Sequence, residues 1–168
     1  FSAHAQQPVK LFRVGFLDSS TASGSAVLLE AFRQELSKLG WTERKNISIE
    51  YRFAEQKNER LPKLAAELVR LKVDIIVASS PQSASVAKKA SSTIPIVLTV
   101  GDPVGLSLVP NLARPDGNLT GLSSLSPELL TKRLEILKDT LPKLARVGVL
   151  WWSGGRITQE NQLKDLRV

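Results

Sequence analysis

The sequence predicts an α/β fold: an open, mostly parallel, doubly wound sheet with helices on both faces and the strand order 2-1-3-4-5. Two observations predict it. Along the 168 residues, short runs that are apolar or alternating are followed by longer segments with apolar side chains at helical spacing, and this alternation repeats. One run, residues 73–78 (VDIIVA), is apolar apart from a single aspartate, as expected of a central parallel strand covered on both faces. Strands that alternate with helices pair as parallel neighbours, which gives this class of fold.

The first half of the chain supplies two strands and two helices. Residues 11–17 (LFRVGFL) form an apolar run with one charge, which predicts a buried strand. Residues 47–53 (ISIEYRF) alternate, which is typical of a strand with one wetter face. Between them a helical stripe ends at Gly40, where a glycine stop is expected. The stripe consists of apolar residues at helical spacing: Leu29, Phe32, Leu36 and Leu39. Residues 61–71 carry a second stripe, whose Pro62 is tolerated only in the first turn.

The third helix is predicted by its first residues. Ser80 suits the N-cap position and Pro81 suits the first helical position. After this helix, residues 94–100 (IPIVLTV) predict a fourth strand, with a proline near its start. Residues 119–122 (LTGL) predict a short fifth strand, reached through a stretch rich in turn residues.

The carboxyl-terminal part repeats the alternation once more. Ser126 followed by Pro127 is another capped helix start. The stripe of this helix consists of leucines: Leu130, Leu134, Leu137 and Leu141. Residues 146–152 (RVGVLWW) predict a sixth strand, and residues 159–166 predict a last helical piece.

Small polar side chains follow the first, third, fourth and fifth predicted strands. Ligands in an open α/β sheet bind beyond the carboxyl ends of the strands, where the strand order reverses. Hydroxyls beside exposed helix N-termini suit a carboxylate, and Asp102 suits an ammonium. The predicted ligand-binding residues are Ser19, Ser20, Thr21, Ser79, Ser80, Gln82, Thr99, Asp102 and Ser123. Serine, aspartate and glycine also favour turns and caps, so each loop alone has a purely structural explanation. Their coincidence across four loops favours a small-molecule cleft.

The sequence lacks the usual catalytic motifs. Cysteine is absent and the single histidine is His4, which excludes thiol nucleophiles, histidine triads and multi-histidine metal sites within this chain. No glycine-rich dinucleotide loop follows the first strand, and neither a P-loop nor a G-x-S-x-G elbow occurs. Asp18 and Asp102 remain as candidates for a carboxylate pair, although carboxylates at such positions usually serve as caps or ligand contacts. We therefore predict binding without chemistry, with an α/β enzyme as the less favoured alternative.

The net charge of +7 predicts a solvated basic surface rather than a nucleic-acid site. Nucleic-acid binding needs basic residues gathered on one face with aromatic residues among them. Here the 23 lysines and arginines are spread along the chain, and aromatic residues make up only 5% of it.

The first residues, FSAHAQQPVK, match an export signal. Ala3-His4-Ala5 has the small-residue pattern that signal peptidase reads. This predicts the remnant of a signal peptide, a mature protein that starts near Gln6, and a periplasmic or otherwise extracytoplasmic location. The alternative is an alanine-rich tail with a chance match.

Three stretches of the chain match a known family: residues 94–151, which begin IPIVLTVGDPVGLSLVPNLARPDGNLTG, and the shorter RVGFLDSS and LPKLAAELVRLKVDIIVASS. With these stretches the chain resembles the substrate-binding proteins of ABC transporters, in the group described as tryptophan/tyrosine-type import. The resemblance implies an exported bacterial protein whose two α/β lobes close on a small amino-acid-like or carboxylate ligand, as in leucine-binding-type periplasmic proteins. It also implies delivery to a membrane permease driven by a separate ATPase, with no cofactor. A ligand-sensing domain of the same ancestry is the alternative.

The resemblance further implies a division into lobes. Residues 1–8 would be the signal-peptide remnant and tail, residues 9–124 the first substrate-binding lobe, and residues 125–168 the hinge and the truncated start of a second lobe. The family's second lobe needs several more strands and helices than the segment after Ser126 supplies. Where relatives usually read Trp-Asn-Pro, this sequence has Trp151-Trp152-Ser153-Gly154-Gly155.

Overall fold

The computed structural model describes residues 11–148 except 116 and 125, and within them the strands form one parallel sheet. The strands are β1 (Phe12–Asp18), β2 (Ile47–Phe53), β3 (Ile75–Ala78), β4 (Ile96–Leu98) and β5 (Leu119–Gly121). Their order is β2-β1-β3-β4-β5, and each of the four pairings is parallel. The predicted α/β class and strand order are therefore confirmed.

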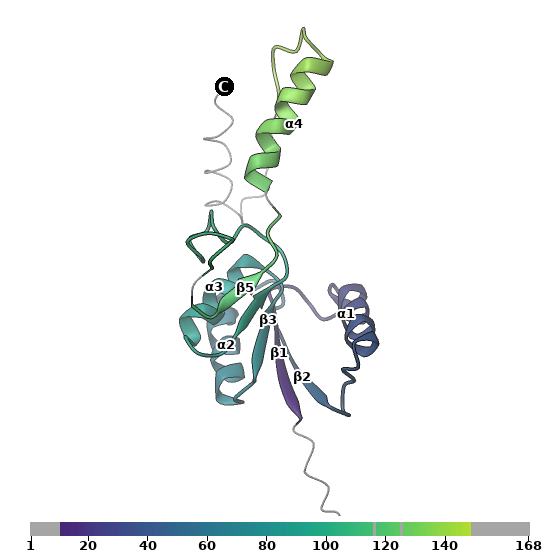
Figure 1. The fold of residues 1–168 in the computed structure, drawn as a ribbon, viewed down its shortest axis with the longest axis vertical. Coiled ribbons are helices and arrows are strands. Elements are labelled where there is room, and N and C mark those ends of the chain that lie inside the picture. Colours follow the sequence, from purple (N-terminus) through teal and green to yellow (C-terminus); the bar gives the residue numbers. More distant parts are fainter. Residues whose placement is uncertain (1–10, 116, 125, 149–168) are drawn as a thin grey trace, which may run out of the picture.

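Helices cover both faces of this sheet (Figure 1). They are α1 (Ala26–Lys38), the short 3-10 helix η1 (Asn58–Arg60), α2 (Leu61–Arg70), α3 (Pro81–Ala90) and α4 (Ser126–Thr140). In Figure 1, α1 lies on one side of the strands and α2 and α3 lie on the other, while α4 stands beyond the edge of the sheet. This is the doubly wound arrangement expected when each helix crosses between parallel strands.

The core has two parts because successive side chains of a strand point to opposite faces. Phe16 packs in one cluster with Leu29 of α1, whereas its neighbour Leu17 packs in the other cluster with Leu68 of α2. Gly15 lets α2 approach closely, since an added Cβ would lie 3.0 Å from both terminal methyl groups of Leu68. Leu17 and Leu68 are fully buried, and burial of a leucine side chain contributes about 1.5–3 kcal/mol.

Local start and stop signals act as the sequence predicts. Ser80 caps α3: its Oγ accepts a hydrogen bond from the amide of Ser83 at 3.2 Å, and Pro81 is the first helical residue. Pro62 lies in the first turn of α2, where its missing N–H costs nothing. Gly40 follows α1 with a φ of +86°, a left-handed conformation that glycine adopts without strain.

Three details of the predicted elements are wrong. Leu39 is 75% exposed because α1 ends at Lys38, so the apolar stripe of this helix ends at Leu36. The third and fourth strands are shorter than predicted: Lys72 turns the chain with a φ of +52° before β3, and Gly101 does so at +141° after β4. Residues 146–148 are not in a strand, and the rest of the predicted sixth strand lies outside the described residues. The N-terminal tail and the helical piece at 159–166 also lie outside them.

Helix α4 projects from the edge of the sheet at which the strands end (Figure 1). Part of its apolar surface is open to solvent, including Ile136 at 54% and Leu129 at 45% exposure, and the last leucine of the predicted stripe, Leu141, lies just beyond the helix. The segment that leads from β5 into α4 is held to the sheet, because the amide of Leu122 donates to the carbonyl of Leu98 at 2.9 Å. The lobe boundary predicted at residue 124 falls between these two elements and stays a prediction.

Candidate functional site

The carboxyl ends of the strands form a hydrogen-bonded rim. The first residues after β3 and β4 donate their amides to carbonyls at the end of the neighbouring strand: Ser79 to Leu17 at 3.1 Å, and Thr99 to Ala78 at 3.1 Å. Leu122 continues the series on the far side of β4. The rim is therefore built by the sheet itself and not by free loops, so the positions of these residues are fixed by the strand register.

Ser19, Ser79 and Thr99 form a row of hydroxyl residues along the rim. They follow β1, β3 and β4, which are adjacent in the sheet. If the strand register is continued by one residue, Thr99 lies opposite Ser79, about 4.8 Å away across the sheet, whereas Ser19 lies one residue beyond Asp18, which is opposite Ser79. The side chains of Ser79 and Thr99 contact the carbonyls of Leu17 and Ala78, each at the long distance of 3.4 Å. Hydrogen bonds of that length are weak, so both hydroxyls keep the capacity to bind a ligand.

The loop between β1 and α1, residues 19–25, is organised by Asp18. The carboxylate is only 5% exposed. It accepts the amide of Ser20 at 2.9 Å and the hydroxyl of Ser25 at 2.5 Å. The Oγ atoms of Ser20 and Ser25 are 2.9 Å apart, and Ser20 Oγ also contacts the carbonyl of Thr21 at 3.1 Å. Thr21 Oγ1 accepts the amide of Gly24 at 3.0 Å. Through these hydrogen bonds Asp18 holds in place the loop that carries three predicted ligand-binding residues.

A second loop, after β2, holds the first one from the side. The amides of Glu55 and Gln56 donate to the carbonyls of Ser20 at 3.0 Å and Ser19 at 2.8 Å. Both donors have left-handed backbone, with φ of 55° and 60°. Sequence reasoning missed this contact, because neither residue is a glycine or asparagine and no pattern marks the turn.

The remaining predicted site residues lie at the rim, and their side chains make different contacts. The hydroxyl of Ser80 is occupied by its capping role, and Gln82 is exposed in the first turn of α3. Asp102 Oδ1 accepts the amide of Gly105 at 2.9 Å, so one of its oxygens organises a turn. An added Cβ at Gly105 would lie 2.0 Å from Asp102 Oδ2, so the Asp102 carboxylate would have to turn away from this turn. Ser123 is half-buried on the segment that follows β5.

The structure gives Asp18 and Asp102 separate partners. Asp18 binds Ser20 and Ser25, while Asp102 binds Gly105. Each carboxylate therefore organises its own loop, which is the usual role of carboxylates at such positions.

The loop of Asp102 is linked to the start of the segment leading to α4. The carbonyl of Gly101 accepts both the amide of Ser124 at 2.8 Å and its hydroxyl at 3.2 Å. Gly101 itself packs against Pro81, since an added Cβ would lie 2.6 Å from the proline ring. The segments that follow β4 and β5 therefore meet the start of α3 at one point of the rim.

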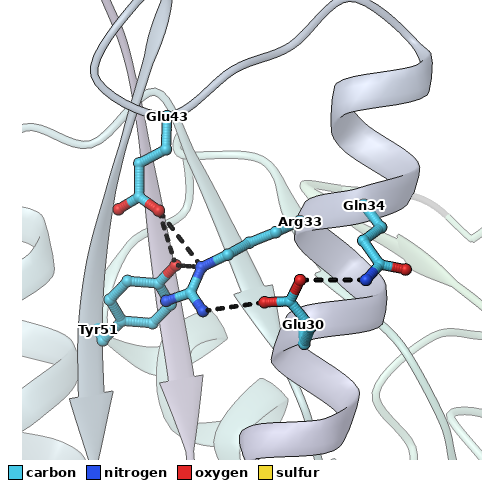
Figure 2. Close-up of polar contacts among 5 residues, drawn as sticks. All are labelled: Glu30, Arg33, Gln34, Glu43 and Tyr51. Atoms are coloured by element: carbon cyan, nitrogen blue, oxygen red, sulfur yellow. Dashed lines mark hydrogen bonds and ion pairs between the residues drawn. The ribbon is translucent and has the colours of Figure 1, made fainter.

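A polar cluster lies between α1 and the outer strand β2 (Figure 2). Arg33 Nε donates to the Tyr51 hydroxyl at 3.0 Å and lies 3.3 Å from the carboxylate of Glu43. The hydrogen bond to Tyr51 raises the pKa of Arg33, and burial raises the pKa of Tyr51. Glu30 lies 3.9 Å from Arg33 and also accepts from Gln34 at 3.1 Å.

This cluster borders a groove of about 320 Å³ that also contains Trp41, Ile47 and Ile49. Ile47 and Ile49 belong to the amino-terminal half of β2, so the groove lies away from the rim. No pattern in the sequence predicts the cluster, because Arg33 and Tyr51 are 18 positions apart and on different elements.

Within the described ranges, no group of three or more His, Cys, Asp or Glu side chains is arranged to hold a metal ion. None of the described helices has the length and apolar character needed to cross a bilayer.

A family model and a curated relative both match this chain, and both are described as binding proteins. The model of the family described as ABC transporter substrate binding protein matches residues 23–166. A protein of Clostridioides difficile named tyrosine-binding protein is 34% identical over 123 residues, which cover 73% of this chain and 35% of that protein.

Solved structures share the fold. A conserved domain protein from Vibrio cholerae superposes with a TM-score of 0.79 at 29% identity, over 94% of this chain and 53% of its own. A ligand-free, open structure of a substrate-binding protein with adhesive properties from Clostridium difficile gives 0.71 at 28% identity, over 94% and 52%. An ABC domain from Streptococcus pneumonia in complex with L-Trp gives 0.76 at 20% identity, over 94% and 52%, and shows the fold alone. The chain thus spans about a third to a half of the length of these proteins.

Proposed function

This chain belongs to the family of ABC transporter substrate-binding proteins, and from that premise we propose that its rim forms one wall of an amino-acid-binding cleft. The family and the relatives are described as binding proteins and not as enzymes. The observation that carries the proposal is the row of hydroxyls on adjacent strand ends, Ser19, Ser79 and Thr99, at the edge where α/β sheets bind ligands.

The chemistry of the rim fits an amino acid with an apolar side chain. Hydroxyls that bind their neighbouring carbonyls only weakly, such as those of Ser79 and Thr99, can turn to a ligand carboxylate. Apolar side chains flank them, since Val100 is 52% exposed and Leu122 is 68% exposed. The relative from Clostridioides difficile is named for tyrosine, an amino acid that combines these features. We propose an aromatic or other apolar amino acid as the ligand.

The other predicted site residues fall into two groups. Gln82 and Ser123, on the rim beside the row, are proposed as further ligand contacts, together with Ser20 and Thr21 of the β1–α1 loop. Ser80 and Asp102 are proposed to act mainly through the shape of their loops, because each uses a side-chain oxygen to bind a backbone amide.

The wider role is proposed from the family. We propose that residues 9–124 form a first lobe, and that the segment from residue 125 begins a second lobe that closes over the ligand. We further propose an extracytoplasmic protein that hands its ligand to a membrane permease of an ABC importer. These steps concern a longer protein than the residues described, since the relatives are about two to three times as long as their match to this chain.

A ligand titration tests the proposal. L-Tyrosine, L-tryptophan and L-lysine are titrated into the chain, and binding is followed by NMR chemical shifts and by thermal unfolding. A ligand present at about ten times its Kd adds roughly 1.4 kcal/mol to the free energy of unfolding, which raises Tm by about 3–6 °C in a protein of this size. We expect shifts from the aromatic amino acids that are confined to the rim.

Matched variants locate the site. Ser79→Ala and Thr99→Val are each expected to weaken binding about tenfold by removal of a hydrogen bond to a charged group. The control is Ser92→Ala, an exposed serine in the loop before β4, at the opposite edge of the sheet. Binding of L-tyrosine that is unaffected by both rim variants, or no binding of any amino acid by the folded chain, would overturn the proposed site.

A further inference from the structure

We propose that the buried carboxylate of Asp18 is a positioning residue that fixes the direction of the hydroxyl hydrogen bonds in residues 19–25, so that Ser20 Oγ presents lone pairs to the ligand's ammonium group. The inference rests on the proposed function, because it takes the ligand to be an amino acid. It assigns the ammonium to Ser20 of the β1–α1 loop, apart from the hydroxyls of Ser79 and Thr99.

The geometry places three oxygen atoms in sequence. Asp18 Oδ2 is 2.5 Å from Ser25 Oγ, and Ser25 Oγ is 2.9 Å from Ser20 Oγ. Asp18 is 5% exposed and Ser25 is 4% exposed, whereas Ser20 is half-buried at the rim. The series therefore runs from the interior to the edge where a ligand would lie.

The direction of donation follows from the number of protons. An ionised carboxylate only accepts hydrogen bonds, so the single hydroxyl proton of Ser25 is donated to Asp18. In its contact with Ser20, Ser25 Oγ is then the acceptor. The hydroxyl proton of Ser20 points either to Ser25 Oγ or to the carbonyl of Thr21 at 3.1 Å, and both lie inside the loop.

A Ser20 side chain whose proton is held inside the loop can only accept from a ligand. A carboxylate has no proton to donate, so it finds no partner there, whereas an ammonium group has three donors. The negative charge of Asp18 behind the two serines favours the same choice. The backbone of the loop is held from outside as well, because Glu55 donates its amide to the Ser20 carbonyl at 3.0 Å.

The variant Asp18→Asn reverses this direction without removing a partner. The asparagine Oδ1 still accepts the amide of Ser20, and its Nδ2 donates to Ser25 Oγ. The proton of Ser25 then turns to Ser20 Oγ, the proton of Ser20 is held at the carbonyl of Thr21, and the negative charge that favours an ammonium group is lost. The side chain keeps its size, so the loop is expected to fold.

Paired ligands separate the role of Asp18 from simple stability. L-Tyrosine and its analogue without the amino group, 3-(4-hydroxyphenyl)propanoate, are titrated into the full chain and followed by NMR. We expect Asp18→Asn to weaken L-tyrosine binding by about tenfold or more, and binding of the analogue by less than about twofold. The milder surface variant Ser20→Ala is expected to give the same selective loss.

The control is Asp74→Asn. Asp74 accepts the amide of Arg13 at 2.8 Å, so it is another carboxylate that binds the backbone of the β1 segment, but at the opposite end of the sheet. This variant is expected to weaken binding of both ligands by less than about twofold, whatever its effect on Tm. Equal losses for both ligands in Asp18→Asn and Ser20→Ala would overturn the inference, as would no loss in either.

A measurement without ligand keeps the inference testable if the chain binds neither compound. In that case the proposed ligand class is wrong, and the hydrogen-bond direction is examined alone. A proton held between Ser25 and Asp18 at 2.5 Å is expected to exchange slowly enough to be seen by NMR as a hydroxyl signal, and to disappear in Asp18→Asn. Absence of this signal from the unaltered chain would overturn the assigned direction.

Discussion

Replacement of Gly121 by alanine tests how the rim is attached to the sheet. Gly121 is the last residue of β5 and has a φ of +152°, where glycine is strongly preferred. An added Cβ would lie 2.1 Å from the carbonyl oxygen of Leu98 and 2.8 Å from its backbone nitrogen. Because these are backbone atoms of the neighbouring strand, they cannot rotate away. β5 must move instead.

The cost has two contributions. A non-glycine residue in such a backbone conformation costs about 1–3 kcal/mol. Movement of β5 also breaks the hydrogen bond from the Leu122 amide to the Leu98 carbonyl, which contributes about 1 kcal/mol. The free energy of unfolding should therefore fall by about 2–4 kcal/mol, a large share of the stability of a typical domain.

Gly117 provides a matched control for the same substitution. Its φ is +74°, but no atom lies within 4 Å of an added Cβ, so alanine there costs only backbone strain, about 1–2 kcal/mol. Urea unfolding measures both losses, and amide exchange of Leu122 reports the local detachment. If Gly121→Ala destabilises the chain no more than Gly117→Ala, and the Leu122 amide stays protected, the steric reasoning is refuted.

Three further predictions follow from other parts of the fold. Ser80→Ala should lower the free energy of unfolding by about 1 kcal/mol through loss of the α3 cap, while Ser80→Asp should retain most of it, as measured by urea unfolding. Leu68→Ala should cost about 2–5 kcal/mol in the same assay because the side chain is fully buried, whereas the exposed Leu39→Ala should change little. Burial raises the pKa of Tyr51, so the folded state holds the phenol proton more tightly than the unfolded state does. The protonated Tyr51 therefore contributes its full stabilisation of the fold below about pH 10, and this contribution is lost as the pH rises further. Comparison of unfolding at about pH 9 and 11 should show that loss in the unaltered chain and less of it in Tyr51→Phe.

Features determined by residues close together in sequence could be predicted well. Ser80 and Pro81 start α3 because a cap and a proline act within one turn of helix, and both were identified from the sequence. The parallel sheet followed from the alternation of strands and helices, and the predicted strand order is confirmed although the alternation alone does not determine it. The stripe of α1 was extended too far, to Leu39, because apolar spacing alone does not show that a helix has ended at the preceding residue.

Features that depend on contacts between distant segments could not be predicted. The left-handed Gln56, which holds Ser19, and the pairing of Arg33 with Tyr51 arise only when β2 lies beside β1 and α1. In the candidate site, the residue types predicted which loops lie at the rim, but not which hydrogen bonds each side chain makes. Asp18 and Ser25 illustrate this, since their contact spans seven positions and is buried.

The double hydrogen bond from Ser124 to the carbonyl of Gly101 has a thermodynamic consequence for a longer protein that contains these residues. Gly101 lies between Thr99 and Asp102, so a ligand that orders this turn also restricts the backbone from which α4 departs. Coupling of two equilibria is reciprocal. If ligand binding at the rim favours one orientation of α4 by a given factor, a contact that holds α4 in that orientation raises the affinity for the ligand by the same factor.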